Sequence, residues 1–575
     1  MVYNPQNPIM VQSDRSILLE TNNQLFEAAR DALAQFAELV KSPEHIHTYQ
    51  ITPLSLWNAA SAGLTADDIL GALHAFTKYD IPQNITQDIK DYVARYGRLK
   101  LIKEGERALV LESEDALLIR EIQHHKTIDP FLEGPLSPNR LLVKKGMRGR
   151  VKQALIKIGF PVEDLAGYVD GLPLDVHMNE LHKRTGREWH LRQYQREAVE
   201  TFYAGGTSRG GSGVLVLPCG AGKTVIGIGV ISKVKQCSLV LTTNITALRQ
   251  WREELINRTS LNEEDVGEYS GEIKQVDRPV VITTYQILTY RKNRNEDFEH
   301  LELFNDGRWG LIVYDEVHLL PAPVFRAVAE IQGKRRLGLT ATLVREDGKE
   351  DDVFSLIGPK KYDVPWKQLE KQGWIATAEC HEIRIPLPEE RRLEYAVADQ
   401  KWKFRISSEN PIKFDVVEKL IERHKEDNIL IIGQYLGQLD DMAARFGAPI
   451  ITGKTPNKER EAIYSQFKSG EIKVLIVSKV ANFAIDLPDA NVAIQISGTF
   501  GSRQEEAQRL GRILRPKDEG RIAHFYSLVT KETKDQEFAE NRQRFLTEQG
   551  YRYKILIYDD NDGDSLLQEL NQLSV

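Results

Sequence analysis

The segment from Val214 to Thr224 has the residue types of a phosphate-binding loop. An apolar run ends at a proline, turns through Gly220 and Gly222, and leads into Lys223 and Thr224. Glycines let backbone N–H groups close around phosphate oxygens, the lysine neutralises phosphate charge, and the threonine hydroxyl can ligate Mg²⁺. Leu217 replaces the first glycine of the general pattern, and the alternative is a plain strand-to-helix turn. We predict a nucleotide site.

A pair of adjacent carboxylates follows a second apolar run. Asp315 and Glu316 come directly after Leu311–Tyr314 and precede His318. In open α/β sheets, ligands bind at the carboxyl ends of the strands. Asp315 would hold Mg²⁺, usually through water, and Glu316 would polarise the attacking water as general base. The alternative is a strand that simply ends in a polar turn.

A third set of polar side chains lies near the end of the chain, at Gln508, Arg512 and Arg515. Helical spacing places them on neighbouring faces, three or four residues apart. Arginines brought to a nucleotide can stabilise the charge that develops on the γ-phosphate. The alternative is a solvated basic helix that pairs with Glu505 and Glu506.

Two α/β units are expected to position these residues. Near-continuous apolar strands that alternate with helical patterns indicate a parallel sheet covered on both faces. The first unit has runs at 214–217, 238–243, 280–285, 311–316 and 337–342, with helices at 247–257 and 324–331. The pattern breaks over about 345–410 and restarts at 429–434, 449–452, 474–479, 492–497 and 523–528. We therefore predict an α/β fold with two tandem lobes.

The first 185 residues differ in kind. We predict helices over 24–40, 66–77 and 85–96 and a hairpin from 98–102 to 108–112, an α+β accessory region. Thr65 is expected to cap the second helix, with Asp67 and Asp68 in its first turn. A basic patch spans Lys144–Lys152 and continues to Lys157.

Composition bounds the class of protein. The chain has 575 residues, 41% of them hydrophobic and 28% charged, which is typical of a soluble globular protein. Cys219, Cys237 and Cys380 have no paired spacing, so neither a disulfide framework nor a zinc site is expected, and a reducing cytoplasm fits. We expect no membrane segment and no signal peptide. The net charge of −7 does not exclude nucleic acid, because local basic patches make phosphate contacts.

The order of the motifs resembles that of superfamily 2 helicases. It comprises Leu191-Arg-Gln-Tyr-Gln195, Gly-Ala-Gly-Lys-Thr, Asp-Glu-Val-His, Thr340-Ala-Thr342 and Gln508-x-x-Gly-Arg-x-x-Arg515. The segment Leu-Pro-Cys-Gly-Ala-Gly-Lys-Thr and an Arg-Glu-Asp element at 345–347 are closer still to XPB-like DNA helicases, a family that Leu217 also suits. The motifs span more than half of the chain.

The resemblance implies an ATP-driven DNA helicase that moves 3′→5′, with RecA-like lobes and a thumb-like insertion. Gln195 would read the adenine with support from Arg192, and Asp486 would contact the nucleotide. His318, Thr340 and Thr342 would link hydrolysis to movement of the strand. The residues implied in strand separation and DNA contact are Arg345, Glu346, Asp347, Trp402 and Phe404.

The expected domains are an accessory domain at 1–130, a small basic DNA-recognition-like domain at 131–185, lobe 1 at 186–365, the thumb-like insertion at 366–415 and lobe 2 at 416–575. The family usually has a glycine and an acidic residue before Ile485, where this chain reads Val480-Ala-Asn-Phe-Ala484. This departure suggests altered coupling of hydrolysis to strand gripping.

The expected partners are DNA, as single strands and duplex junctions, and a nuclease or repair protein. The expected location is the cytoplasm, on the nucleoid when DNA is bound, and the implied setting is nucleotide excision repair or DNA opening. Three alternatives stay open: an RNA helicase, a double-strand translocase or remodeller with weak unwinding, and a binding-only scaffold.

Overall fold

The structure is a computed structural model of the whole chain, and it describes most of the residues. The described ranges are 3–42, 45–105, 108–290, 300, 303, 307–343, 350–478, 490–498, 506, 509–511, 513 and 522–558. Contacts divide the chain into two compact units, Met1–Leu217 with Gly222–Val364, and Pro218–Ala221 with Pro365–Val575. None of the helices in the described ranges combines the length and apolar character needed to cross a bilayer.

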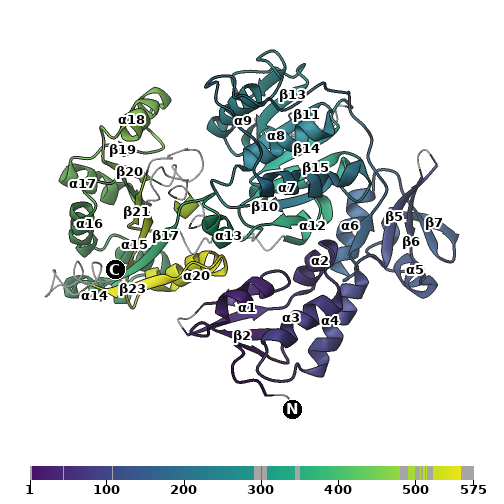
Figure 1. Cartoon of the computed structure of the whole chain (residues 1–575), viewed down its shortest axis with the longest axis horizontal. Helices are drawn as coiled ribbons and strands as arrows, with labels where there is room; N and C mark the ends of the chain where they lie inside the picture. Colours follow the sequence, from purple (N-terminus) through teal and green to yellow (C-terminus); the bar gives the residue numbers. More distant parts are fainter. Residues whose placement is uncertain are drawn as a thin grey trace. The chain divides into compact units, whose positions relative to one another are not determined.

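The first unit contains a seven-stranded sheet in the order β12-β13-β11-β14-β15-β10-β16 (Figure 1). Every neighbouring pair is parallel. The strands are β10 Ser212–Val216, β11 Ser238–Thr242, β12 Val266–Tyr269, β13 Val280–Thr284, β14 Leu311–Asp315, β15 Arg335–Thr340 and β16 Lys360–Asp363. The five predicted strands of this lobe are confirmed, and the edge strands β12 and β16 are additional to the prediction.

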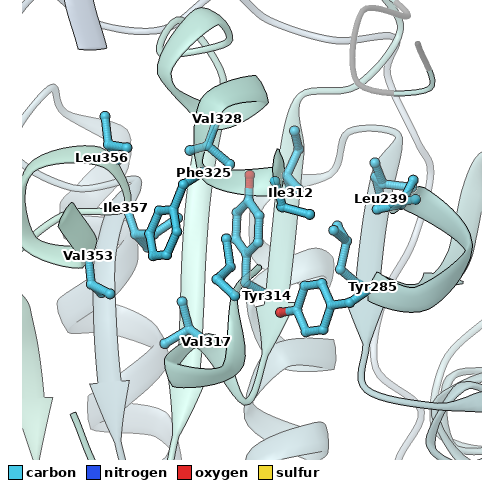
Figure 2. Close-up of a cluster of buried hydrophobic side chains, with 14 of the residues drawn as sticks. Leu239, Tyr285, Ile312, Tyr314, Val317, Phe325, Val328, Val353, Leu356 and Ile357 are labelled. Carbon is cyan, nitrogen blue, oxygen red and sulfur yellow. The ribbon is translucent and has the colours of Figure 1, made fainter. Parts of the chain in front are cut away.

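Helices cover both faces of this sheet, so its strands are apolar on both sides. They are α7 Gln193–Tyr203, α8 Lys223–Val234, α9 Ile245–Arg258, α10 Tyr285–Leu288, α11 Ala322–Glu330 and α12 Glu350–Leu356. Leu239, Ile312 and Tyr314 pack with residues of α11 and α12 in one buried cluster (Figure 2). On the opposite face, α8 packs closely against α9 and β15. A Cβ on Gly227 of α8 would lie 2.4 Å from the Trp251 ring and 3.2 Å from Leu339.

The N-terminal region corrects one prediction. The chain from 24 to 40 is not one helix: α1 covers Phe26–Leu33, and β3 Glu38–Lys41 joins an antiparallel sheet in the order β1-β2-β4-β3. The other strands are β1 Ile9–Val11, β2 Ser16–Glu20 and β4 Ile46–Gln50. Pairing with β4 decides the conformation of 38–41, because Leu39 lies opposite Tyr49 and both are buried. This sheet is missing from the sequence-based prediction.

Other N-terminal predictions are confirmed. The expected helices over 66–77 and 85–96 are α3 Ala66–Phe76 and α4 Gln83–Arg95, which follow α2 Pro53–Ser61. Thr65 caps α3, since its Oγ1 accepts a hydrogen bond from the Asp68 N–H at 3.1 Å. The predicted hairpin is the antiparallel pair β5 Leu99–Glu104 and β6 Ala108–Glu112.

That hairpin belongs to a five-stranded sheet in the order β7-β8-β6-β5-β9. Its other strands are β7 Leu132–Ser137, β8 Arg140–Val143 and β9 Val162–Asp164, with α5 Ala116–Gln123 and α6 Arg148–Lys157 between them. Two cations of the predicted basic patch are internal: Arg148 and Lys152 lie 2.7 and 2.9 Å from carboxylate oxygens of Asp164. Burial lowers the pKa of Lys152 to about 7. These two cations bind a carboxylate of the protein, so they are not available to DNA phosphates as the patch suggests.

The N-terminal regions pack directly on the first parallel sheet and its helices. Trp57, Ile156 and Phe354, from α2, α6 and α12, form one buried cluster. A Cβ on Gly149 would lie 2.4 Å from the carbonyl oxygen of Ala329, so α6 contacts α11 at backbone distance. The accessory regions and lobe 1 therefore share one compact unit.

The second unit contains another seven-stranded parallel sheet, in the order β19-β20-β18-β21-β22-β17-β23. Its strands are β17 Ala378–Ile385, β18 Ile429–Gly433, β19 Ile450–Ile451, β20 Val474–Ser478, β21 Val492–Gln495, β22 Ala523–Thr530 and β23 Tyr553–Ile557. The described helices include α13 Trp366–Lys371, α16 Ile412–Arg423, α17 Leu436–Phe446, α18 Asn457–Ser469 and α20 Lys534–Glu548. The five predicted strands are confirmed. The segment predicted as a thumb-like insertion contributes β17 to this sheet.

Two helices follow β17, α14 Glu389–Val397 and α15 Gln400–Ser408. Trp402 is 52% exposed, with the Arg405 guanidinium 5.2 Å from its ring. Phe404 is fully buried and packs edge-on against Phe538, with ring centroids 5.0 Å apart. The DNA contact expected of Phe404 does not fit this structure, because its ring belongs to the core. The Trp402 ring keeps an accessible surface.

Candidate functional site

The phosphate loop leaves β10 and enters α8 through two glycines in left-handed backbone. Gly220 and Gly222 have φ values of +83° and +81°. The left-handed backbone at position 222 favours glycine, and a Cβ there would lie 2.7 Å from Nε2 of Gln195, so it would displace the Gln195 amide. The Leu217 side chain is buried, and its N–H donates to the Thr340 carbonyl at 3.0 Å. The backbone at position 217 thus ties the loop to β15, and the leucine side chain belongs to the core.

The first residues of α8 carry the loop's polar side chains. Lys223 and Thr224 open the helix, where unpaired backbone N–H groups and the helix dipole favour an anion. The Lys223 ammonium lies 3.5 Å from Oε1 of Glu316. The lysine of the loop and the second acid of the pair, predicted from segments far apart in the sequence, are therefore neighbours.

The acid pair stands at the carboxyl end of β14, as predicted. Glu316 has a φ of +48°, a left-handed conformation that costs a non-glycine residue about 1–3 kcal/mol and that clusters at functional sites. Its N–H donates to Oδ1 of Asp315 at 3.1 Å. The Tyr285 hydroxyl donates to the Asp315 carbonyl oxygen at 2.9 Å. These contacts fix the backbone that presents both carboxylates.

The pKa values of the two carboxyl groups are shifted in opposite directions. Burial, and next the charge of Glu316, raises the pKa of Asp315 to about 6. Burial is also the largest influence on Glu316 and would raise its pKa, but Lys223 and His318 outweigh it and leave that pKa below its usual value. Glu316 is therefore the more readily ionised of the two, and an ionised carboxylate is the state that a general base requires.

A chain of contacts continues from the acid pair to β15. His318 is buried; its Nδ1 lies 2.7 Å from Oγ1 of Thr340 and 3.5 Å from Oε2 of Glu316. The Thr340 hydroxyl donates to the Thr342 carbonyl at 2.6 Å and accepts from the Thr342 N–H at 3.2 Å. Because that hydroxyl has one hydrogen, Nδ1 of His318 must be the donor at 2.7 Å. The three predicted coupling residues therefore form one connected group.

Gln195 and Arg192 lie at the start of α7. The Arg192 N–H donates to Oε1 of Gln195 at 2.9 Å, and the Arg192 guanidinium lies 3.3 Å from the Tyr194 hydroxyl. Nε2 of Gln195 lies 3.4 Å from the same hydroxyl. The predicted adenine-reading side chain is thus oriented by its neighbours and lies against Gly222.

The structure adds Trp251 and Tyr285 to the residues that the sequence indicates. The Trp251 side chain is buried, and its indole N–H donates to Oδ2 of Asp315 at 2.9 Å. Trp251 lies in α9. The spacing of apolar residues in this segment predicts a helix, but nothing in the sequence indicates the hydrogen bond to Asp315. Neither residue belongs to a motif quoted for the resemblance.

Several predicted site residues lie outside the described residues: Arg345, Glu346, Asp347, Asp486, Gln508, Arg512 and Arg515, together with the altered segment at 480–484. Described neighbours of the last three are Glu506, Arg509, Leu510 and Ile513, all buried and helically spaced. Glu506 accepts from Nε2 of Gln495 at 2.9 Å. Glu506 is therefore not a solvated partner for surface arginines, as the alternative interpretation of this helix required.

The donors at this site fit Mg²⁺ and a nucleotide phosphate. Asp315 and Thr224 supply carboxylate and hydroxyl oxygens, the ligands that Mg²⁺ prefers. The raised pKa of Asp315 reflects buried negative charge that a divalent cation would offset. The two left-handed glycines and the start of α8 form the cradle that a phosphate requires.

The fold and the site define the class of protein: two parallel-sheet lobes, a phosphate loop and a connected acid–histidine–threonine group are those of a superfamily 2 helicase. Three family models match the chain: the ERCC3/RAD25/XPB C-terminal helicase over 369–571, the helicase conserved C-terminal domain over 9–134 and the type III restriction enzyme res subunit over 188–345. The chain belongs to the XPB family of ATP-dependent helicases, as the next comparisons establish.

The relatives match over nearly their whole length. The chain is 53% identical over 559 residues to the DNA 3′-5′ helicase XPB of Mycobacterium tuberculosis, covering 97% of this chain and 99% of that protein. It is 53% identical over 556 residues to the DNA 3′-5′ helicase XPB of Kineococcus radiotolerans, covering 97% of each. It is 35% identical over 569 residues to the general transcription and DNA repair factor IIH helicase/translocase subunit XPB of Enterocytozoon bieneusi, covering 96% and 92%. The predicted resemblance is confirmed.

Proposed function

We propose that this chain couples ATP hydrolysis to 3′→5′ movement on DNA and separates the strands of a duplex. The observation that carries the proposal is the unbroken set of contacts from Lys223 through Glu316 and His318 to Thr340 and Thr342. A displacement of Glu316 can therefore pass to the segment after β15 through its contact with His318 and the hydrogen bonds of Thr340. The family membership of the chain supports the choice of DNA as the track.

The residues divide the work as follows. Mg²⁺, when bound, would neutralise phosphate charge and orient the phosphates. Its ligands in this proposal are Thr224 and Asp315. The nucleotide contacts assigned to lobe 1 are Arg192, Gln195, Gly220, Gly222 and Lys223. We retain Asp486, Gln508, Arg512 and Arg515 as proposed contacts from lobe 2, the last three stabilising charge on the γ-phosphate.

Glu316 acts as the general base in this mechanism. Its carboxylate is ionised, is held by the left-handed turn after β14, and can accept a proton from an attacking water. His318 shares Glu316 with Lys223 and donates to Thr340, so a displacement of Glu316 alters the hydrogen bond that holds Thr340. Positioning and electrostatic stabilisation supply most of the catalysis in phosphoryl transfer.

The wider setting follows the predicted organisation. We propose that one DNA motor, acting in the cytoplasm and on the nucleoid, is built from all the predicted parts of the chain. These are the accessory domain at 1–130, the basic domain at 131–185, the two lobes and the thumb-like insertion at 366–415. Arg345, Glu346 and Asp347 are proposed to separate strands, and Trp402 to contact bases. A nuclease or repair protein is the proposed partner, in nucleotide excision repair or DNA opening.

The assignment of Glu316 as general base is tested with Glu316→Gln, which keeps the shape of the side chain and removes its charge. The variant should bind ATP and lose DNA-stimulated turnover by at least about 100-fold, the scale of a general base. Glu263→Gln, at a side chain that is 80% exposed, is the matched control and should hydrolyse ATP normally. Normal turnover in Glu316→Gln would refute the assignment.

The choice of DNA as the nucleic acid substrate is tested by comparing stimulation of the ATPase activity by DNA and by RNA. Strand displacement is then measured on tailed duplexes of both polarities. Greater stimulation by RNA would favour an RNA helicase, whereas DNA-stimulated hydrolysis without displacement would favour a double-strand translocase. Alanines at 345–347 should reduce strand displacement more than hydrolysis. Equal loss of both activities would contradict the separation role.

A further inference from the structure

Three donors of the kinds that bind transition metals converge on one face of the second sheet. Glu379 and His381 come from β17 and His524 from β22; one ligand atom of each lies within 4.8 Å of the others. The parallel register places Glu379 beside His524, and residues two apart on a strand share a face. The convergence is therefore set by the backbone pairing of two neighbouring strands.

His381 is the buried member of this cluster. Its side chain is 3% exposed, and neither ring nitrogen has a hydrogen-bond partner among the described residues. Nε2 points toward the cluster, 3.5 Å from Oε2 of Glu379. The ring is held in place by stacking on Tyr526, with centroids 4.9 Å apart. A buried imidazole without a partner destabilises a fold, and a bound ion is one of the recognised explanations.

A third imidazole close by, His424, already has partners for both of its nitrogens. Its Nδ1 lies 3.0 Å from Oδ2 of Asp427, and its Nε2 lies 2.9 Å from the Tyr526 hydroxyl. The two histidines therefore differ: both ring nitrogens of His424 have partners in the protein, and neither ring nitrogen of His381 has a hydrogen-bond partner among the described residues. The cluster of ligands is thus limited to Glu379, His381 and His524.

One cation lies beside the cluster. The Lys554 ammonium lies 3.7 Å from Oε2 of Glu379 and competes for this carboxylate. The Lys554 side chain is 38% exposed and can turn into solvent.

We propose that Glu379, His381 and His524 bind a divalent transition-metal ion of the Zn²⁺ type, which joins β17 to β22. Two imidazoles and a carboxylate are a known Zn²⁺ donor set, with water in the fourth position. Metal–ligand bonds of about 2.0–2.1 Å place tetrahedral donors about 3.4 Å apart, so the cluster closes by small side-chain movements. Glu379 and His524 are 26% and 20% exposed and have room to move. This site is independent of the proposed ATPase function.

The test is Zn²⁺ binding to the full chain, freed of metal by a chelator and kept in millimolar Mg²⁺ to occupy the acid pair. Competition with a chromophoric chelator should give one Zn²⁺ per chain, and Co²⁺ should give the visible spectrum of a four-coordinate nitrogen–oxygen site. Zn²⁺ should also raise the melting temperature. Failure to bind Zn²⁺, or binding without any change in melting temperature, would overturn the proposal.

Variants separate a metal site from a structural cluster. His381→Ala and His524→Ala should each weaken Zn²⁺ binding by about 10–100-fold, whereas the exposed His124→Ala should not change it. Lys554→Met removes the competing cation and should tighten binding by about tenfold. That last variant retains all three ligands, so it tests the site even if the histidine variants fold poorly. Equal binding by His381→Ala and His124→Ala, or weaker binding by Lys554→Met, would refute the site.

Discussion

Replacing Trp251 with phenylalanine tests whether the geometry of Asp315 limits hydrolysis. The substitution keeps an aromatic ring in the core and removes the indole N–H that donates to Oδ2 of Asp315 at 2.9 Å. The variant should still bind DNA, because the change leaves every surface charge in place. Its ATPase activity should become more dependent on Mg²⁺.

The structure sets the magnitude of this effect. A hydrogen bond to a carboxylate contributes about 1.5–3 kcal/mol, and about 1.4 kcal/mol is tenfold in an equilibrium or rate. Residues that orient metal ligands typically change metal affinity or activity by about 10–100-fold. We therefore expect kcat/KM for ATP to fall by about 10–100-fold at limiting Mg²⁺. The Trp251 hydrogen bond lowers the pKa of Asp315, so its loss should move the acid limb of the pH profile to higher pH.

The assay is DNA-stimulated ATP hydrolysis at several Mg²⁺ concentrations between pH 5.5 and 8, with the melting temperature measured in parallel. Trp309→Phe is the matched control: Trp309 is also buried, but its indole N–H donates to the Leu303 carbonyl at 2.8 Å. It should lose stability without any change in Mg²⁺ dependence. If Trp251→Phe retains the wild-type Mg²⁺ dependence and pH profile, the indole does not orient Asp315.

Three further predictions concern the same unit. Thr340→Val removes the hydroxyl that accepts a hydrogen bond from His318, and it should reduce strand separation per ATP by about tenfold. This ratio is measured as strands displaced per ATP hydrolysed. The control Thr283→Val removes a buried hydroxyl with no hydrogen-bond partner in the described chain and should preserve the ratio. Gly222→Ala should raise KM for ATP by at least about tenfold, because strain and the approach of Gln195 both oppose a Cβ; Gly146→Ala, at φ +79° with open space, controls for strain alone. Burial and its acidic neighbour raise the pKa of Asp315 to about 6, and only the ionised form binds Mg²⁺, so affinity for Mg–ATP should fall about tenfold per pH unit below 6. Isothermal titration should find this slope absent in Asp315→Asn.

The sequence predicts the strands that are continuous apolar runs and misses strands whose sequences are short or mixed. β10, β11, β13, β14 and β15 are apolar runs bounded by turns, so their pattern is decisive. The edge strands β12 and β16 have short, mixed sequences that local pattern alone does not distinguish from loops. The segment 38–41 shows the same limit, because its pairing with residues 46–50 outweighs the helical period that precedes it.

Candidate site residues were predictable where a motif constrains both type and spacing. Lys223, Glu316 and His318 come from such motifs and are neighbours in the structure. Trp251 was not predictable, since a buried tryptophan on an amphipathic helix is ordinarily a core residue and only the three-dimensional approach of β14 gives it an acceptor. Phe404 shows the opposite error, because the resemblance implies contact with DNA and only the structure shows that this ring is buried in the core.

Lys223 connects substrate binding to the strength of the base. Its ammonium lies 3.5 Å from Glu316 and is the largest of the influences that lower the pKa of that carboxyl group. A lysine that turns toward a phosphate must weaken this ion pair, and the pKa of Glu316 then rises because burial remains. A carboxylate with a higher pKa is a stronger base. Glu316 is therefore a weaker base while it pairs with Lys223, and it becomes a stronger base when Lys223 binds a phosphate instead. Proton abstraction is thereby favoured only when the phosphate loop is occupied.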